Sequence, residues 1–399
     1  MIKARSELWH NRIVKSITFI VTKDCQLACK YCYLVGKNEK ERMSWQIAKS
    51  AIDYILDNED QFKEESVIWD FIGGEPFLEI VLIDKICDYI KKEMYRRNHH
   101  WFNSYRFSFS TNGINYHTQQ VQDFISKNHN HLSIGITIDG TKKKHDLNRI
   151  WKGEGPEKGS YEDVVRNIPL WLSQFPSAGT KVTISSADIP YIKESVLHLY
   201  SLGIHEVNIN VVFEDVWKEG DDLLFEDQLM QLADAIIDED LYQDYTCSFF
   251  SEFIGKPMDP KLENQNWCGA GKMLSVDAAG NFYPCTRFAA YSLREKKPII
   301  IGNVNEGIDP NKLRPFLTLD RTTQSPQECI DCDVASGCAW CQGENYDAAE
   351  TNTIYQRSTA ICKMHKARVR ANNYYWNKLF RKLEKTGEMR PESKNDVIC

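Results

Sequence analysis

Strand-like and helix-like runs alternate regularly between residues 16 and 212, and this alternation limits the possible folds more than any other feature. The strand-like runs are short and β-branched, whereas the helix-like runs repeat apolar residues every three or four positions. Such alternation predicts a parallel sheet with right-handed crossovers, and therefore an α/β fold. We expect six β/α repeats, with strands at 16–21, 66–71, 106–111, 132–138, 181–185 and 206–212, and helices at 45–58, 78–97, 118–127, 160–173 and 191–202.

The pattern changes after about residue 225, where a helix is expected over 225–237. Residues 260–362 are irregular and rich in cysteine, and a long basic, aromatic helix is expected over 363–383. A length of 399 residues agrees with two or three domains at about 150 residues each. The expected division is a 1–14 extension, a 15–225 β/α domain, a 226–262 bridging region, a 263–383 cysteine-rich domain and a 384–399 polar tail.

The chain contains 13 cysteines, although Met1–Glu7 lacks the apolar segment of a secretory signal. No apolar run approaches the ~20 residues of a membrane span, so we expect a cytoplasmic protein that does not enter the membrane. Disulfides are disfavoured in the reducing cytosol, and clustered thiols there indicate metal ligands or redox groups. The net charge of −7 argues against nucleic-acid binding.

The first expected strand leads into a loop that places Cys25, Cys29 and Cys32 within eight residues. A [4Fe–4S] cluster takes four ligands, so three thiols would leave one iron open. A zinc site that lacks its fourth ligand, or simply buried thiols, would also explain this spacing.

Polar and glycine-rich motifs follow several expected strands at their carboxyl ends. They include Gly73-Gly74-Glu75-Pro76, Thr111-Asn112 and the segment from Thr137 to Arg149. In β/α barrels this rim is the active-site face. A carboxylate such as Glu75 accepts from an ammonium group, and Arg149 can bind a carboxylate at two points, so the set is complementary to an amino acid head group.

At these positions, over about residues 15–215, the chain resembles the radical S-adenosylmethionine (SAM) enzymes. Their Cys-x3-Cys-x2-Cys loop after the first strand of a partial (β/α)6 TIM barrel is matched by Cys25, Cys29 and Cys32. The resemblance implies a [4Fe–4S] cluster that binds SAM, and cleavage of SAM to a 5′-deoxyadenosyl radical that abstracts a hydrogen atom. The implied SAM contacts are Tyr31 beside the adenine, Gly73, Gly74 and Glu75 at the amino group, Thr111 and Asn112 near the nucleoside, and Thr137 and Arg149 near the ribose and carboxylate.

Seven further cysteines lie between residues 268 and 362. One or two structural zinc sites would fit their spacing. Because it follows motifs that resemble a radical SAM enzyme, the region resembles a SPASM domain, which holds two auxiliary [4Fe–4S] clusters in radical SAM enzymes that act on peptides. With the SAM-binding cluster, three clusters are implied in all. The implied ligands are Cys329, Cys332, Cys338 and Cys362 for the outer cluster, and Cys268, Cys285 and Cys341 for the inner one.

The chain departs from the SPASM pattern at three places. Only two residues, Ala339 and Trp340, precede Cys341 where three are usual. The inner cluster has three obvious ligands, so either a distant thiol such as Cys247 completes it or an open iron binds a substrate thiolate. The position that carries an aspartate base in formylglycine-forming relatives is Thr286, which disfavours that reaction.

The resemblance implies a cysteine-containing precursor peptide as substrate and an electron donor such as flavodoxin or ferredoxin. Within this group, the chain most resembles maturases that join a cysteine sulfur to a carbon of another residue, forming a thioether. An acidic acceptor residue could meet Lys142–Lys144, although such a run is typical of a solvated face. Carbon–carbon crosslinking, formylglycine formation and epimerisation remain alternatives, as does a zinc-stabilised binding protein without catalysis.

Overall fold

The computed structural model describes residues 14–37, 39–153, 158–259 and 268–387, which form two compact units. Among the described residues, unit 1 draws on 14–28, 32–135 and 268–319, and unit 2 on 29–31, 136–259 and 320–387. Each unit therefore combines segments that the sequence analysis assigned to different domains, and the domain bounds given there remain a prediction.

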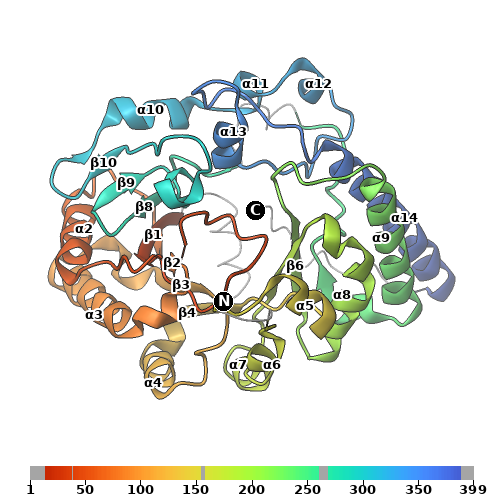
Figure 1. The fold of residues 1–399 in the computed structure, drawn as a ribbon, viewed down its shortest axis with the longest axis horizontal. Coiled ribbons are helices and arrows are strands. Elements are labelled where there is room, and N and C mark those ends of the chain that lie inside the picture. The colour runs from red at the N-terminus through yellow and green to blue at the C-terminus, as the bar shows by residue number, and fades with distance from the viewer. Residues whose placement is uncertain (1–13, 38, 154–157, 260–267, 388–399) are drawn as a thin grey trace. The chain divides into compact units, whose positions relative to one another are not determined.

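Unit 1 is built on a sheet whose central strands are parallel. β1 pairs with β2 in the register Thr18↔Asp70, and β2 pairs with β3 in the register Asp70↔Ser108. The connecting helices lie outside the strands (Figure 1). The elements are β1 (Val14–Thr22), α2 (Trp45–Asp57), β2 (Ser66–Gly73), η1 (Pro76–Glu79), α3 (Ile80–Arg96), η2 (His100–Asn103), β3 (Tyr105–Thr111), α4 (Gln119–Asn128), η3 (His129–His131) and β4 (Leu132–Ile136).

Apolar side chains on these elements explain why they pack as they do. Phe19 and Phe71 stack across β1 and β2 with ring centroids 5.8 Å apart, and Trp69 meets Trp101 edge to face. All four rings are buried, and burial of one such side chain stabilises the fold by roughly 1.5–3 kcal/mol. Ser44 begins α2 as its N-cap, because its hydroxyl accepts from the backbone N–H of Ile47, as the sequence predicted.

The cysteine-rich segment adds four short strands to this same sheet. β8 pairs in parallel with β1 in the register Ile17↔Leu274, and β9, β10 and β11 continue the sheet in antiparallel order. The segment that carries Cys285 is thereby tied to the strand that leads to Cys25. The elements are β8 (Leu274–Val276), β9 (Asn281–Tyr283), η7 (Thr286–Phe288), η8 (Ala290–Ser292), β10 (Gly302–Asn303), β11 (Gly307–Ile308) and α10 (Pro310–Thr318).

Unit 2 holds a separate sheet in which β5, β6 and β7 pair in parallel. The predicted parallel strands are therefore divided between two sheets. The hydroxyl of Thr180 on β5 donates to the carbonyl of Ile136 at 2.7 Å and accepts from the N–H of Ile138 at 3.1 Å, so this side chain holds residues 136–138 of the same unit beside β5. The elements up to β7 are α5 (Lys142–Asn148), α6 (Tyr161–Val165), α7 (Ile168–Gln174), β5 (Thr180–Ile184), η4 (Ser186–Tyr191), α8 (Ile192–Ser201), β6 (Glu206–Val211), α9 (Asp221–Asp238), η5 (Leu241–Gln243) and β7 (Thr246–Cys247).

The C-terminal part of unit 2 ends in a long helix that packs along α9 (Figure 1). Ion pairs between Arg370 and Glu226 and between Lys378 and Asp234 join the two helices. The elements are α11 (Arg321–Gln324), α12 (Gln327–Ile330), α13 (Gln342–Ala348) and α14 (Cys362–Thr386).

Two sequence expectations differ from the structure in detail. The helix expected over 160–173 is divided into α6 and α7, because Pro169 stands in the first turn of α7, where its missing N–H is tolerated but a preceding helix cannot continue. The strand expected over 132–138 ends at Ile136, and the backbone N–H of Ile138 donates to the Thr180 hydroxyl instead of continuing the strand.

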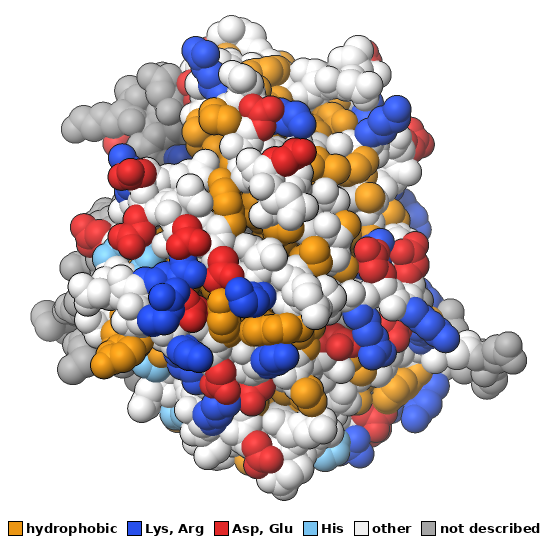
Figure 2. Space-filling view, turned by 90° about the vertical axis from the view of Figure 1, so that its left-hand side faces the viewer, with side chains coloured by type: hydrophobic (Ala, Val, Ile, Leu, Met, Phe, Trp, Pro, Cys, Tyr) orange, Lys and Arg blue, Asp and Glu red, His pale blue; other side chains and the backbone are white. Residues whose placement is uncertain are grey.

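On the face that Figure 2 shows, acidic and basic side chains are interspersed rather than gathered by sign. Such a face lacks the single-sign field that attracts nucleic acid. None of the helices in the described ranges is both long and apolar enough to cross a bilayer.

Candidate active site

The loop between β1 and α2 carries three cysteines at the carboxyl end of the first strand. Cys25 is buried, Cys29 and Cys32 are partly exposed, and none of the three forms a disulfide. In unit 1, the Cys25 sulfur accepts the backbone N–H of Leu27 at 3.3 Å, and the side-chain amide of Asn112 lies 3.8 Å from it. A residue at the end of β3 therefore reaches the first cysteine of the loop.

Glu75 connects the ends of β2 and β3 within unit 1. Its carboxylate is 1% exposed. One oxygen accepts from the hydroxyl of Thr111 at 2.7 Å and from the backbone N–H of Phe77 at 3.0 Å, and the other accepts from the backbone N–H of Asn112 at 2.7 Å. The predicted residues Glu75, Thr111 and Asn112 thus form one network, in which Glu75 orients the loop that approaches Cys25.

Gly73 and Gly74 let two strand-end loops approach each other closely. A Cβ at Gly73 would lie 2.1 Å from the carbonyl oxygen of Thr22, and a Cβ at Gly74 would lie 2.1 Å from that of Asp24. The backbone N–H of Gly74 donates to Thr22 at 2.9 Å, and that of Glu75 donates to Asp24 at 2.8 Å. The glycines therefore fix the position of the residue that precedes Cys25.

In unit 2, Tyr31 joins the predicted site residue Arg149 to the buried Asp139. Its hydroxyl donates to Asp139 at 2.5 Å and accepts from the Arg149 guanidinium at 2.9 Å. Burial raises the pKa of Asp139, but the charges of Lys144 and Arg149 outweigh that effect and hold it below its usual range, so Asp139 is an anion at neutral pH. Thr137, the remaining predicted SAM contact in this unit, is half-buried just after β4.

Arg149 is 6% exposed, and its Nε has no hydrogen-bond partner among the described residues. A buried guanidinium N–H without an acceptor carries a desolvation cost of about 1–3 kcal/mol or more. A carboxylate placed there would remove that cost, so the side chain fits the carboxylate-binding role that the sequence predicted.

The structure corrects the expectation that Lys142–Lys144 forms a solvated basic run. Lys144 is fully buried, donates to the carbonyl of Thr183 at 2.8 Å and lies 3.8 Å from Asp139 and 3.6 Å from Asp188. Lys142 and Lys143 are exposed and fit the surface description, and Lys142 pairs with Asp146. The sequence analysis missed this buried ionic network because three consecutive lysines are normally exposed.

The cysteines predicted for the inner auxiliary cluster fall in both units, with Cys268 and Cys285 in unit 1 and Cys341 in unit 2. This ligand set remains a prediction. Cys247, the candidate fourth ligand, lies on β7 and is 5% exposed. Burial raises the pKa of its thiol to about 12, which is typical of a core thiol rather than of a ligand.

The four cysteines predicted for the outer cluster line one cavity of about 80 Å³ in unit 2. A single water needs only about 10–15 Å³, so the cavity accommodates a larger group. Burial raises the pKa of the Cys338 thiol, and the nearby Arg357 charge opposes that effect without cancelling it. We call this cavity, lined by Cys329, Cys332, Cys338 and Cys362, the four-thiol cavity.

A zinc ion does not fit the four-thiol cavity well. Zinc binds sulfur at about 2.3 Å, which places the ligands of a tetrahedral site about 3.8 Å apart. Within the described ranges, no three cysteine sulfurs all lie within 4.8 Å of one another. The thiols are therefore spread more widely than a single zinc ion requires, and an all-thiolate donor set suits a [4Fe–4S] cluster.

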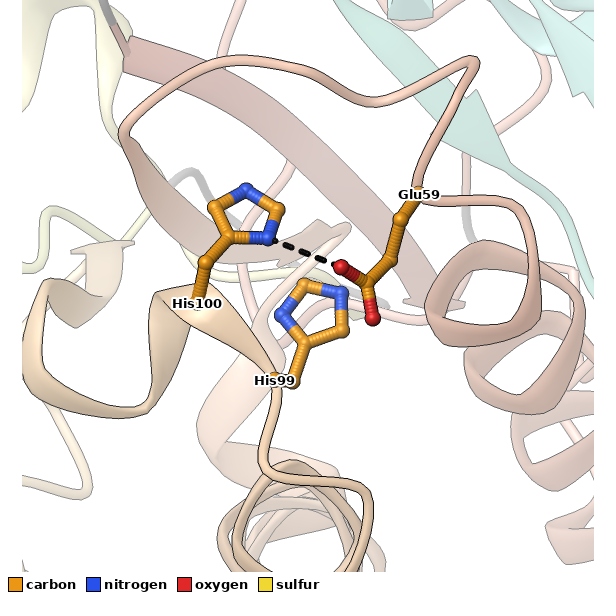
Figure 3. Close-up of side chains that lie close together, drawn as sticks. All are labelled: Glu59, His99 and His100. Atoms are coloured by element: carbon orange, nitrogen blue, oxygen red, sulfur yellow. Dashed lines mark hydrogen bonds and ion pairs between the residues drawn. The ribbon is translucent and has the colours of Figure 1, made fainter.

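Glu59, His99 and His100 do meet this 4.8 Å limit (Figure 3). The Nδ1 atom of His99 accepts the backbone N–H of Trp101 at 3.2 Å, so Nε2 carries the ring hydrogen. A histidine that binds a metal instead offers the lone pair of one ring nitrogen to the metal and donates the N–H of the other nitrogen to an acceptor. Burial lowers the pKa of His99 to about 4, so its ring is neutral at pH 7, and the bond within the cluster joins Nδ1 of His100 to a Glu59 carboxylate oxygen at 3.4 Å.

Residues 14–155 match a family model described as a 4Fe–4S single cluster domain. An uncharacterised protein of Methanocaldococcus jannaschii is 26% identical over 308 residues, which cover 75% of this chain and 91% of that protein. A cysteine-type anaerobic sulfatase-maturating enzyme of Clostridium novyi is 29% identical over 164 residues, which cover 39% of this chain and 41% of the relative.

The fold is also found in solved structures. Native anSMEcpe with bound AdoMet matches with a TM-score of 0.67 at 17% identity, over 94% of this chain and 100% of that one. Streptococcus suis SuiB bound to the precursor peptide SuiA matches with a TM-score of 0.56 at 13% identity, over 89% of this chain and 78% of that one. The α/β fold and the partial barrel predicted from the sequence are thereby confirmed.

Proposed function

We propose that this chain is a radical SAM enzyme that modifies a peptide. The observation that carries the proposal is the loop of Cys25, Cys29 and Cys32 at the end of β1, where the Asn112 amide reaches a cysteine sulfur. Three thiolates would hold a [4Fe–4S] cluster with one iron free for the amino and carboxylate groups of SAM. When bound, this cluster supplies the electron that cleaves SAM to methionine and a 5′-deoxyadenosyl radical.

The residues around the loop would bind and orient SAM. Arg149 would give its unpaired Nε–H to the carboxylate of the methionine part, while Tyr31 holds the other end of the guanidinium. Glu75 would keep Thr111 and Asn112 in place beside the nucleoside. The remaining predicted contacts, Gly73, Gly74 and Thr137, belong to the same proposal.

The cysteine-rich segment would hold two auxiliary [4Fe–4S] clusters. The outer cluster would occupy the four-thiol cavity, where no three sulfurs all lie within 4.8 Å of one another. The inner cluster would use Cys268, Cys285 and Cys341, and the buried position of Cys247 favours an iron that is left open for a substrate thiolate. These clusters would take up the electron that the peptide reaction releases.

The finer proposal is that the product is a thioether. The acceptor carbon loses a hydrogen atom to the adenosyl radical, the cysteine thiol loses a proton, and one electron leaves as the carbon–sulfur bond forms. Thr286 supports this reaction over formylglycine formation, because its hydroxyl is a poor base near neutral pH. A fold shared with a structure that holds a precursor peptide supports a peptide substrate.

Formylglycine formation is the second candidate, and the similarity to a sulfatase-maturating enzyme favours it. Its product differs from a thioether in chemistry that can be measured. A cysteine converted to formylglycine loses its sulfur, whereas a thioether retains the sulfur and is two hydrogens lighter than the substrate.

The first test concerns the cofactors. Protein purified without oxygen should be brown and contain about twelve irons, four for each of three clusters. Adding SAM should change the EPR spectrum of the reduced protein, and a reduced flavodoxin or ferredoxin should release 5′-deoxyadenosine. Colourless protein loaded with zinc would contradict the proposal.

The second test concerns the product. A small cysteine-rich peptide encoded beside the gene is incubated with the enzyme, SAM and reductant, and the product is examined by mass spectrometry before and after thiol alkylation. A thioether is two hydrogens lighter and one cysteine no longer alkylates. A carbon–carbon link keeps every thiol reactive, and an epimerised peptide keeps its mass.

A further inference from the structure

Arg357 lies at the four-thiol cavity and is held from several sides. Its guanidinium donates to the sulfur of Cys338 at 3.1 Å and to the hydroxyl of Ser325 at 3.3 Å. The guanidinium also packs on the ring of Trp340, 4.4 Å from the ring centroid. Because Arg has a planar, rigid group of donors, these three contacts together fix its position.

The other charged side chains at the cavity are less able to act on the thiols. Lys366 and the acidic Glu328 are both exposed, so water and salt screen their charges. His365 donates from Nε2 to the carbonyl of Val334 at 2.7 Å, and burial lowers its pKa to about 4, so it is neutral at pH 7. Arg357 is thus the half-buried cation of the cavity lining that contacts a cysteine sulfur.

A cluster held by four thiolates is anionic, and reduction adds one more negative charge. Hydrogen bonds to the sulfurs and nearby cations stabilise the reduced state more than the oxidised state, and so raise the reduction potential. A hydrogen bond from a charged donor is roughly twice as strong as one from a neutral donor. Arg357 supplies both effects at Cys338.

We propose that Arg357 is a positioning residue that raises the reduction potential of a cluster bound in the four-thiol cavity. This inference rests on the proposed function. The cluster gains the one electron released when the carbon radical and the thiolate join, and the guanidinium keeps all its protons. With the Arg357 guanidinium in place, this cluster would therefore be the more favourable electron acceptor.

The test is an EPR-monitored redox titration of the anaerobically purified full chain. The outer-cluster signal is assigned by its loss in Cys338→Ala. In Arg357→Gln, the ratio of oxidised to reduced outer cluster at a fixed potential should rise about tenfold, which is 59 mV for a one-electron couple. The matched control is Arg370→Gln on α14, which removes the same charge from a side chain bonded to Glu226 and should leave the ratio unchanged.

An unchanged ratio in Arg357→Gln, or an equal change in Arg370→Gln, overturns the inference. If Arg357→Gln fails to assemble the outer cluster, Arg357→Lys and Trp340→Leu are titrated instead. A lowered potential in either one supports the inference, and wild-type potentials in both overturn it. Protein without any cluster would refute the proposed function itself, whereas normal SAM cleavage with an unchanged potential refutes only the role of Arg357.

Discussion

Both thiol sites of this chain place a side-chain N–H beside a cysteine sulfur, but with different donors. At the loop after β1, the neutral amide of Asn112 lies 3.8 Å from Cys25. At the four-thiol cavity, the cationic guanidinium of Arg357 lies 3.1 Å from Cys338. The first site has three thiols and a weak donor, and the second has four thiols and a strong one.

The number of thiols suits the two sites to different roles, ligand binding at the first and electron transfer at the second. A site with three thiolates leaves a coordination position for a ligand, so its chemistry depends on what binds there. A site with four thiolates is saturated, so its remaining variable is its potential, which nearby charge adjusts. The following changes test this division, beginning with the one that should have the largest effect.

Cys25→Ala should reduce 5′-deoxyadenosine release to background. Removing one of three thiolates leaves too few ligands to hold the cluster that binds SAM. The measurement is chromatography of the nucleoside after incubation with SAM and reductant. Cys87→Ala is the control, because Cys87 is a core thiol on α3 and its loss should leave SAM cleavage intact. Full release by Cys25→Ala would contradict the three-thiol assignment.

Cys338→Ala should act on the product rather than on SAM. We expect about eight irons in place of about twelve, continued release of 5′-deoxyadenosine, and loss of the modified peptide. Iron analysis and mass spectrometry of the peptide measure the two outcomes. If this variant makes product at the wild-type rate, the outer site has no part in accepting the electron.

Glu75→Gln should destabilise unit 1 moderately. The replacement has one acceptor oxygen, so one of the buried donors now bonded to the carboxylate, such as the N–H of Asn112, faces an NH2 group. An unsatisfied buried donor costs about 1–3 kcal/mol, and urea denaturation should show a loss of this size. Glu39→Gln is the surface control, since Lys23 keeps its ion pair with Glu41 and the change should be below about 1 kcal/mol. Equal effects in the two variants would mean that the Glu75 network contributes nothing specific.

Asn112→Ala should have the smallest effect on redox behaviour. Its amide is neutral and lies 3.8 Å from the Cys25 sulfur, against 3.1 Å for Arg357 and Cys338, so the potential of the SAM-binding cluster should move less than that of the outer cluster does in Arg357→Gln. The same EPR titration compares the two variants. If Asn112→Ala shifted the reduction potential more than Arg357→Gln does, the neutral amide would be the stronger of the two donors and the prediction would be wrong.

The sequence could predict features that are local along the chain. The spacing of Cys25, Cys29 and Cys32 is visible directly, and the glycines at 73 and 74 mark a close approach of backbone. The strands β1, β2 and β3 were predicted within two residues at every boundary, because β-branched runs that end in polar loops are a strong signal.

Features that depend on distant contacts could not be predicted. β8 has three residues, too few for a periodic pattern, and it pairs with β1 from more than 250 positions away. Lys144 belongs to a run that is typical of a surface, and its burial depends on the carboxylates of Asp139 and Asp188. Arg357 is a single arginine in an irregular segment, and only folding brings it to Cys338.

The close contact at Gly73 and Gly74 has a consequence for motion. Because backbone atoms already occupy the volume that a methyl group would need, the loop ahead of Cys25 cannot shift without breaking the bond from the Glu75 amide to Asp24. Exchange of that one amide proton with deuterium therefore reports how often the cysteine loop opens.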